Sequence, residues 1–501
     1  MAQADLQRIR LGLLGLAILL PWLFPPQGGP SPGVQPWLFS VACMAVLLIG
    51  ASLADLTTAS GRAVVAGAWL AAGLLSSVTG LCQYFEVEHH FAPWMSEAGP
   101  GEAYGNLRQR NQFASLTNIA TAALLYLTTR LRAMTVWQRL GVLVAAAVLA
   151  TGTAAAASRT GLLGLLLILG LGWVWGSWRQ DLARRVIIVA LGSYVLAGWM
   201  LAPLAGYETG SSGIYARFVN TGPECAGRLS LWSNMLYLIS QRPWSGWGWG
   251  ELDFAHFITD YPGTRNCELL DNAHNLPLHL AVELGIPAAA LISAAGAWLI
   301  VRARPWREEN SGRRMAWAVL ALILLHSMLE YPLWYGPFQL TMVLALGMLL
   351  ARPAKPQPVT LYRQASWQGG LAVLMLAAAA YAAWDYHRVS QIFYPPDFRA
   401  AAYRDNTLEK IRGTWLFQDQ AQFAEFTLTP LTPGNAEHLY EMGQRVLHYS
   451  PEARVVEKLI ECAVLLGRDE AARFYLARYK AAFPKEHARW AARQLEPVKP
   501  H

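Results

Sequence analysis

The sequence predicts an all-α, polytopic membrane protein that ends in a small helical domain. The chain of 501 residues is 54% apolar, contains 21 tryptophans and has only 15% charged residues, which is unusual for a soluble protein. Apolar stretches long enough to cross a bilayer recur from near the N-terminus to about residue 388, and the sequence beyond that point is charged. We therefore expect a membrane domain over 1–388 and a separate domain over 389–501.

The apolar stretches predict about eleven transmembrane helices, each of roughly 17 to 25 residues. The first stretch has no clear small-residue cleavage site, so we expect it to be retained as a helix. The predicted helices are centred near Ala17, Val46, Leu74, Ala122, Ala147, Leu167, Leu196, Ala290, Leu322, Ala345 and Met375.

The positions of arginine and lysine predict the orientation, because cytoplasmic loops hold these residues in excess. Basic residues gather on alternate connections, at 8–10, 130–139, 179–185, 302–314 and 352–363. These connections are expected in the cytoplasm, which places segment 205–273 and the C-terminal domain outside it, in the periplasm of a Gram-negative cell. The net charge of +7 therefore reflects topology, and no basic face with interleaved aromatic residues indicates nucleic-acid binding.

The predicted exterior segment 205–273 is too long to be a simple connector. It contains the amphipathic helical pattern "GRLSLWSNMLYLIS" and two cysteines, Cys225 and Cys267. A disulfide between them is expected in an oxidising compartment and would stabilise the loop by about 4 kcal/mol. The terminal segment resembles degenerate tetratricopeptide repeats, with Gly467 at a helix break, and is either a docking surface or a structural cap.

Two polar groups lie on the exterior side of the predicted membrane domain, where their cost makes a functional role the first hypothesis. "GNLRQRNQFASL" contains Arg108, Gln109 and Asn111 just before the fourth predicted helix. "SRTG" places Arg159 in a tight turn between two apolar helices. The alternative in both cases is that the arginines only extend their side chains toward the interface.

Three further exterior motifs combine charge with aromatic residues. "GRLSLW" sets Arg228 at the head of the amphipathic pattern, where a guanidinium offers paired donors to a phosphate, with Trp232 one turn on. "PWSGWGWGE" is either an interfacial aromatic belt or a surface for sugar or lipid. "HSMLEYPLWY" places His326 and Glu330 on one helix face, as a structural pair or as part of a site. The adjacent histidines of "FEVEHHF" make a poor metal site, and we expect no metal or other cofactor.

"DNAHNLPLHLAVELG" is the best candidate for a general base. His274 is predicted at the exterior end of the eighth transmembrane helix, between Asn272 and Asn275, with Glu283 two turns further along. A neutral imidazole accepts a proton from an alcohol near pH 7, although a lone histidine is as often a structural residue.

In this order, "NLRQRNQFASL", "SRTG", "GRLSLW", "PWSGWGWGE", "DNAHNLPLHLAVELGIP" and "HSMLEYPLWYGPF" resemble the bacterial O-linked protein oligosaccharyltransferases, or pilin glycosylation ligases. That family shares a superfamily with the O-antigen ligases and polymerases. The resemblance covers about residues 100 to 345 and extends more loosely into the terminal domain. "SRTG", the arginine-to-tryptophan element and "HN" are common to the superfamily, whereas "NLRQ" and "HS.LEYPLWY" are more specific to the protein-glycosylating branch.

The resemblance implies transfer of a glycan from undecaprenyl pyrophosphate to a hydroxyl of an acceptor protein such as a type IV pilin. The site would lie on the periplasmic face of the bacterial inner membrane. His274 would act on the acceptor hydroxyl, while Arg159 and Arg228 would neutralise the pyrophosphate leaving group. The resemblance assigns supporting contacts with substrate to Arg108, Gln109, Asn111, Trp232, Asn275 and Glu330.

Several other functions remain open at this stage. An O-antigen ligase would use the same donor with a lipid A core sugar as the acceptor, and a polymerase would extend the glycan on its carrier. The exterior helical domain and "NLRQ" argue against a ligase. A flippase or transporter would hold its ionisable residues near the bilayer midplane, whereas here nearly all lie toward one face. A purely structural membrane scaffold would not need this one-sidedness.

Overall fold

A computed structural model describes residues 2–24, 29–51, 58–130, 134–208, 224–350 and 358–495. Across these ranges the chain forms helices, turns and loops, with no strand. Residues 209–223 of the predicted exterior segment, and the predicted cytoplasmic residues Arg352 and Lys355, lie outside the described ranges. The chain divides into two compact units, one of residues 1–220 with 298–383 and one of 221–297 with 384–501. The predicted boundary at residue 388 stays a prediction.

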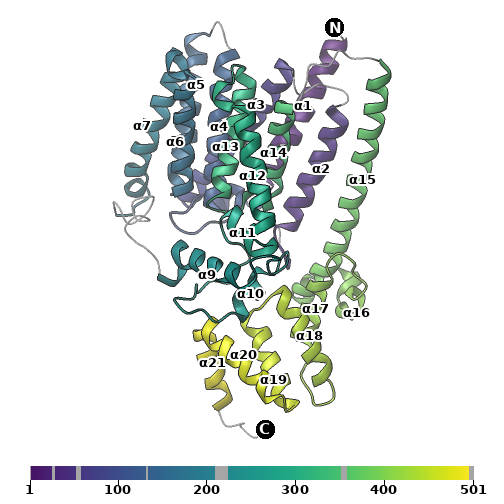
Figure 1. Ribbon diagram of the computed structural model, residues 1–501. Coiled ribbons are helices and arrows are strands. Elements are labelled where there is room, and N and C mark those ends of the chain that lie inside the picture. The colour runs from purple at the N-terminus through teal and green to yellow at the C-terminus, as the bar shows by residue number, and fades with distance from the viewer. Residues whose placement is uncertain are drawn as a thin grey trace. The chain divides into compact units, whose positions relative to one another are not determined.

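Long helices make up the first unit, and several of them pack side by side (Figure 1). The helices that lie wholly within it are α1 (Ala2–Leu23), α2 (Val34–Ala51), α3 (Ala59–Tyr84), α4 (Arg110–Arg130), α5 (Val136–Ala155), α6 (Arg159–Val174), α7 (Asp181–Leu204), α13 (Ser311–Ser327) and α14 (Gly336–Leu350). The division between the units falls inside α12 (Ile286–Ala303) and α15 (Pro358–Ser390).

Each of the predicted transmembrane centres lies within one of these helices. Five helical segments in the described part of the chain are long and apolar enough to cross a membrane, which confirms a helical membrane protein. These segments are Ala59–Tyr84, Val136–Ala155, Asp181–Leu204, Ile286–Arg307 and Trp367–Phe393. The full count of about eleven spans stays a prediction.

The helix α4 differs from its neighbours because it is buried on nearly all sides and yet carries many polar side chains. It packs against α3, α5, α6 and α13. Its buried hydroxyls bond to nearby groups, as when Thr117 Oγ1 lies 2.7 Å from Thr153 Oγ1 on α5. A helix that satisfies its polar groups against its neighbours does not need a lipid-facing apolar surface.

The second unit begins with the segment 221–297. It forms α9 (Arg228–Gln241), the short α10 (Leu252–Ile258) and α11 (Leu276–Leu284). One face of α10 packs Leu252 and Ala255 into a core shared with α9 and α11. The other face packs Phe254 and Phe257 into the core of the terminal helices. The helix α10 therefore joins the two halves of this unit.

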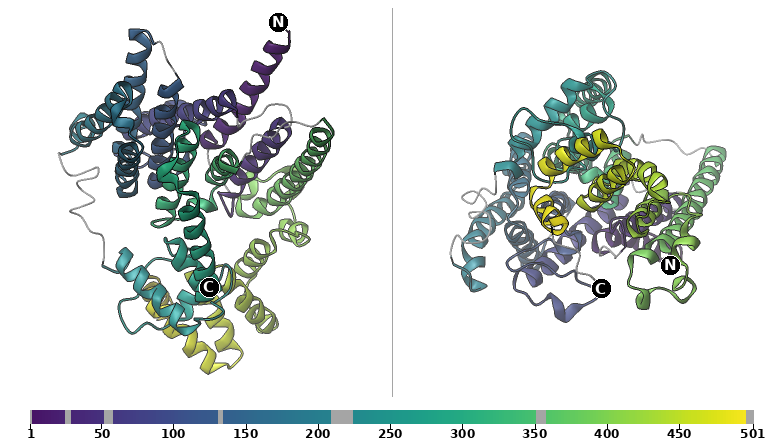
Figure 2. Two further views of the ribbon diagram at one scale, coloured as in Figure 1. Left: turned by 45° about the horizontal axis from the view of Figure 1, so that its top comes forward. Right: turned by 90° about the horizontal axis from the view of Figure 1, so that it is seen from below.

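The terminal half of the second unit is a series of short amphipathic helices. After α16 (Thr407–Ile411) come α17 (Gln418–Leu428), α18 (Ala436–Tyr449), α19 (Ala453–Leu465), α20 (Asp469–Ala482) and α21 (Pro484–Leu495). Successive helices from α17 onward pack against each other (Figure 2). Gly467, with a φ of 68°, makes the turn between α19 and α20. The relation to tetratricopeptide repeats stays a prediction.

Candidate functional site

In the first unit, the side chain of Glu330 bonds to polar residues just before and within the first turn of α4. Its carboxylate accepts hydrogen bonds from Asn111 Nδ2 at 2.9 Å and from Gln109 Nε2 at 3.3 Å. The side chain of Glu330 is buried. Arg108 comes one residue earlier, exposed and in the left-handed region with a φ of 53°. Three of the predicted binding residues are thus in direct contact, and Arg108 is presented beside them.

The same cluster fixes the "SRTG" turn. Ser158 Oγ donates to Asn111 Oδ1 at 2.6 Å and accepts from the Gly161 N–H at 2.9 Å, so Ser158 caps α6. A Cβ atom at Gly161 would lie 2.5 Å from that of Ala114, so only glycine permits this approach of α4 and α6. Arg159 is then the first residue of α6 and is exposed.

Ser115 also belongs to this cluster, although it was not among the predicted site residues. Its hydroxyl lies 2.9 Å from His326 Nδ1, and both side chains are buried. Asn111 and Ser115 are one turn apart on α4, and His326 lies one turn before Glu330. The Asn111–Glu330 and Ser115–His326 contacts therefore lie one helical turn apart and join the same two segments of the chain. Polar residues at i and i+4 in both segments were the sequence signal that could have indicated this pairing.

In the second unit, Arg228 begins α9 and is exposed. Trp232, one turn further along α9, donates its indole N–H to the carbonyl of Ala273 at 3.2 Å. Ala273 immediately precedes His274. One helix therefore carries Arg228 and also holds the segment that presents His274.

His274 occupies a turn that its neighbouring asparagines define. The backbone N–H of His274 donates to Asn272 Oδ1 at 2.9 Å, and the residue has a left-handed φ of 50°. Asn275 Oδ1 accepts from the Leu278 N–H at 3.1 Å and so caps α11. These bonds hold the half-buried imidazole at the beginning of a helix. Asn275 thus has a capping contact, and its predicted contact with substrate stays a prediction.

The predicted place of His274 at the start of the eighth transmembrane helix is wrong. Two helices replace the expected one, because Gly285, with a φ of 84°, separates α11 from α12. His274 therefore precedes the short α11, and the apolar span begins at Ile286. The apolar sequence is nearly continuous across the break, so its periodicity alone does not reveal it.

The tryptophans of the Gly/Trp run have different environments. Trp247 donates its indole N–H to the Leu238 carbonyl at 3.0 Å, and the guanidinium of Arg242 stacks on its ring at 4.2 Å. Trp244 and Trp249 are 81% and 63% exposed. Trp247 is thus a packing residue, and only the other two have the surface that a belt or a sugar contact requires.

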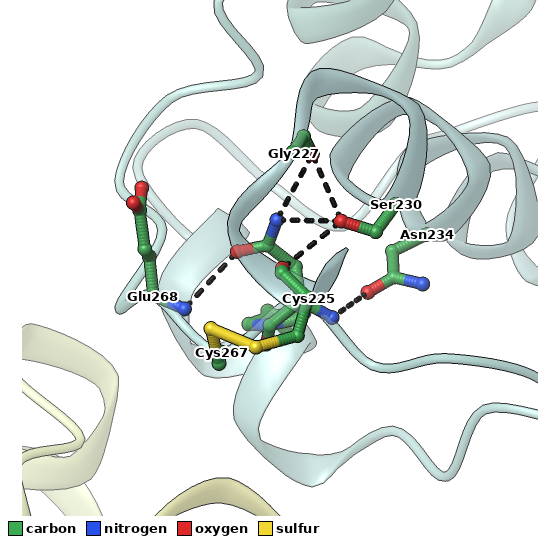
Figure 3. The surroundings of a disulfide bond; sticks show 8 residues. Cys225, Gly227, Ser230, Asn234, Cys267 and Glu268 are labelled. Atoms are coloured by element: carbon green, nitrogen blue, oxygen red, sulfur yellow. Dashed lines mark hydrogen bonds between the residues drawn. A yellow bond between two sulfur atoms is a disulfide. The ribbon is translucent and has the colours of Figure 1, made fainter. Parts of the chain in front are cut away.

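Near α9, the structure joins Cys225 to Cys267 by a disulfide with a Cα–Cα distance of 5.3 Å (Figure 3). Next to Cys267, the Asn266 N–H donates to Asn234 Oδ1 at 2.7 Å, and Asn266 Nδ2 donates to Ser230 Oγ at 3.1 Å. The disulfide and these bonds tie the loop before His274 to the first turns of α9.

Known proteins match three parts of the chain. A family model described as protein glycosylation ligase matches residues 103–127, which include Gln109 and Asn111. One described as O-antigen ligase matches 142–293. One described as virulence factor membrane-bound polymerase, C-terminal, matches 314–496.

Two relatives from Acinetobacter baylyi align over most of the chain. A general O-oligosaccharyltransferase is 26% identical over 355 residues, which cover 66% of this chain and 59% of the relative. A ComP-specific O-oligosaccharyltransferase is 22% identical over 353 residues, which cover 68% and 62%. The chain is similar to the O-linked oligosaccharyltransferases. The superfamily resemblance expected from the motifs is thereby confirmed. The matches span only about three fifths of the relatives' length, and no solved structure matches the chain.

Proposed function

We propose that this protein transfers a glycan from a lipid-linked pyrophosphate donor to a hydroxyl group of an acceptor protein outside the cytoplasm. The observation that carries the proposal is the link from Arg228 through Trp232 to the His274 turn. Arg228, which we propose binds phosphate, and His274, which we propose is the base, thus belong to segments that are bonded to each other within one unit. The similarity to O-oligosaccharyltransferases supports the class of reaction.

The arginines are suited to bind a pyrophosphate. Arg159 and Arg228 are each the first residue of a helix, and neither helix has an acidic residue in its first turn. The positive end of a helix dipole adds to the guanidinium charge at such a position. Both groups would stabilise the negative charge that develops on the leaving group.

In the proposed step, the acceptor hydroxyl oxygen bonds to the anomeric carbon of the donor sugar. The bond between that carbon and the phosphate oxygen breaks, and its electron pair leaves with the lipid pyrophosphate. The hydroxyl proton passes to the imidazole of His274, which acts as the general base. Gln109, which bonds to Glu330, and the preceding Arg108 would support donor binding. A pilin as acceptor and undecaprenyl as carrier are part of the proposal, as is a site on the periplasmic face of the inner membrane.

The test is transfer by purified full-length protein. Wild type, co-expressed or incubated with a lipid-linked glycan and a candidate pilin, should produce a glycan mass shift on the acceptor. His274→Ala should remain folded and lose about 10² to 10⁴ in rate, as expected for removal of a general base. Arg159→Ala and Arg228→Ala should instead weaken binding of the lipid pyrophosphate, with Arg228→Lys intermediate because an ammonium lacks the guanidinium fork. Transfer at the wild-type rate by His274→Ala would refute the mechanism.

O-antigen ligation is the second candidate, because the family model with that description covers Arg159, Arg228 and His274. The two functions differ only in the acceptor. Offering purified lipid A core and a pilin in parallel separates them, since a ligase would modify the core sugar and leave the protein unmodified.

A further inference from the structure

A cavity of about 210 Å³ lies in the first unit, between the last turns of α4 and α6 and the first turns of α13. Its walls are largely apolar, and each helix contributes to them, with Leu125 from α4, Leu171 from α6 and Met315 from α13. The Glu330 cluster lies at the other ends of α4 and α13, because Asn111 is in the first turn of α4 and Glu330 follows α13. The cavity is therefore separate from the candidate site.

The polar residues that line this cavity come mainly from two connections that are bonded to each other. Trp175, at the end of α6, donates its indole N–H to the Pro305 carbonyl at 2.9 Å, and the Trp175 carbonyl accepts from Arg314 Nη1 at 3.2 Å. Within the described part of the chain, the guanidinium of Arg314 bonds to backbone carbonyls and forms no ion pair. The cavity thus has a polar end whose shape is fixed by hydrogen bonds.

A second cavity of about 210 Å³ is next to the first, since Gln180 lines both. Its charged lining residues are Arg139, Asp181 and Arg185. Asp181 is ion-paired with Arg184 and Arg185 at 2.9 Å each. Arg139 is exposed and forms no ion pair with a residue that the structure describes. The second cavity therefore carries an excess of positive charge.

The two cavities together suit a molecule with an apolar part beside a negative charge. An apolar cavity of about 150 Å³ takes up benzene, so the first cavity has room for part of an acyl chain. A phosphate fits the second cavity, where a guanidinium offers paired donors, better than the first, where Glu309 offsets the charge of Arg314. These charged residues lie on connections predicted in the cytoplasm, next to the leaflet that carries anionic headgroups.

We propose that the two cavities form a binding site for an anionic phospholipid of the cytoplasmic leaflet, such as phosphatidylglycerol. Part of an acyl chain lies among Leu125, Leu171 and Met315, and the phosphate lies against Arg139 and Arg185. A lipid bound only by the folded protein stabilises it, here at the ends of the helices opposite the Glu330 cluster. The site is independent of the proposed transfer reaction.

The experiment measures the unfolding temperature and the lipid affinity of delipidated full-length protein in detergent. The probes are phosphatidylglycerol, phosphatidylcholine and glycerol 3-phosphate. Phosphatidylglycerol should raise the unfolding temperature. Phosphatidylcholine, which has no net charge, should need a higher concentration for the same shift, and glycerol 3-phosphate, which has no acyl chain, should give none.

Two variants test the two cavities separately. Arg139→Gln should weaken the affinity for phosphatidylglycerol about fivefold, as expected for one basic group beside an anionic headgroup, and leave that for phosphatidylcholine unchanged. Ala318→Leu places a larger side chain in the apolar cavity and should weaken binding of both lipids. The matched control is Arg179→Gln, at an exposed arginine of the same connection that lines neither cavity. It should change neither affinity.

Equal stabilisation by phosphatidylglycerol and phosphatidylcholine would overturn the inference, and so would stabilisation by glycerol 3-phosphate. Equal losses of affinity in Arg139→Gln and Arg179→Gln would show only a general attraction between charges. Unchanged lipid binding in folded Ala318→Leu would place the acyl chain outside the cavity. If Ala318→Leu does not fold, the comparison of Arg139→Gln with its control still decides, because both positions are exposed.

Discussion

Glu330 shows how a single side chain organises the polar cluster at the start of α4. It bonds to Asn111, which lies 219 positions earlier in the chain, and Asn111 in turn accepts from Ser158 of the "SRTG" turn. The three motifs thus meet through one buried carboxylate and one amide. A change at Glu330 should therefore affect the other two motifs as well.

We predict that Glu330→Leu lowers the stability of the protein and its binding of the donor. The substitution leaves the amides of Gln109 and Asn111 without their acceptor, at a cost of about 1 to 3 kcal/mol. Glu330→Gln, which keeps an acceptor, should be milder. Thermal unfolding in detergent and binding of the lipid pyrophosphate measure the two effects, with the exposed Glu309→Leu as the control. Equal unfolding temperatures for Glu330→Leu and this control would show that the carboxylate does not hold the cluster.

At the scale of elements, α10 connects the loop that carries His274 to the terminal helices. Glu251, at its start, lies 2.7 Å from His448 Nδ1 on α18, and the Phe254 ring stacks on His448 at 3.7 Å. On the other side, His256 is buried, and burial together with the nearby Arg265 lowers its pKa to about 3. The terminal helices therefore support the segment that carries His274.

We predict that Asp253→Asn makes the protein relatively more stable as the pH rises. Burial, with the nearby Glu251 and Asp271, raises the pKa of Asp253 in α10 to about 7. A carboxyl with a raised pKa stabilises the folded state fully below its ordinary value, and this contribution is lost as the pH rises from about 4 through 7. The unfolding temperature of wild type should therefore fall relative to Asp253→Asn over that range. Asp260→Asn, at an exposed position nearby, is the control. A constant difference between wild type and Asp253→Asn from pH 4 to 8 would contradict the prediction.

For the whole molecule, the distribution of basic residues predicts that residues 389–501 lie outside the cytoplasm. An alkaline phosphatase fusion after residue 400 should be active, because that enzyme needs an oxidising compartment to form its disulfides. A cytoplasmic reporter at the same point should be inactive. The reverse result would place the terminal helices in the cytoplasm. His274, which lies in the same unit, would then be on the cytoplasmic face, and the proposed mechanism would be wrong.

The sequence by itself determined the helical membrane class, the places of the long helices and the motifs. Apolar length and periodicity are local properties, and a bilayer leaves helices as the main solution for such stretches. The superfamily resemblance could likewise be predicted from local motifs such as "NLRQ" and "SRTG", and the comparisons with known proteins confirm it.

Only the tertiary structure decided which polar residues meet. Asn111 with Glu330, Ser115 with His326, and Trp232 with the carbonyl before His274 are contacts between segments far apart in the chain. The break at Gly285 also depends on packing, because its left-handed turn lets the backbone at Trp244 approach within a distance that no Cβ atom permits. The hydrophobic pattern of a sequence indicates which face of a helix is buried. The partner of a buried polar group depends instead on how the surrounding helices pack.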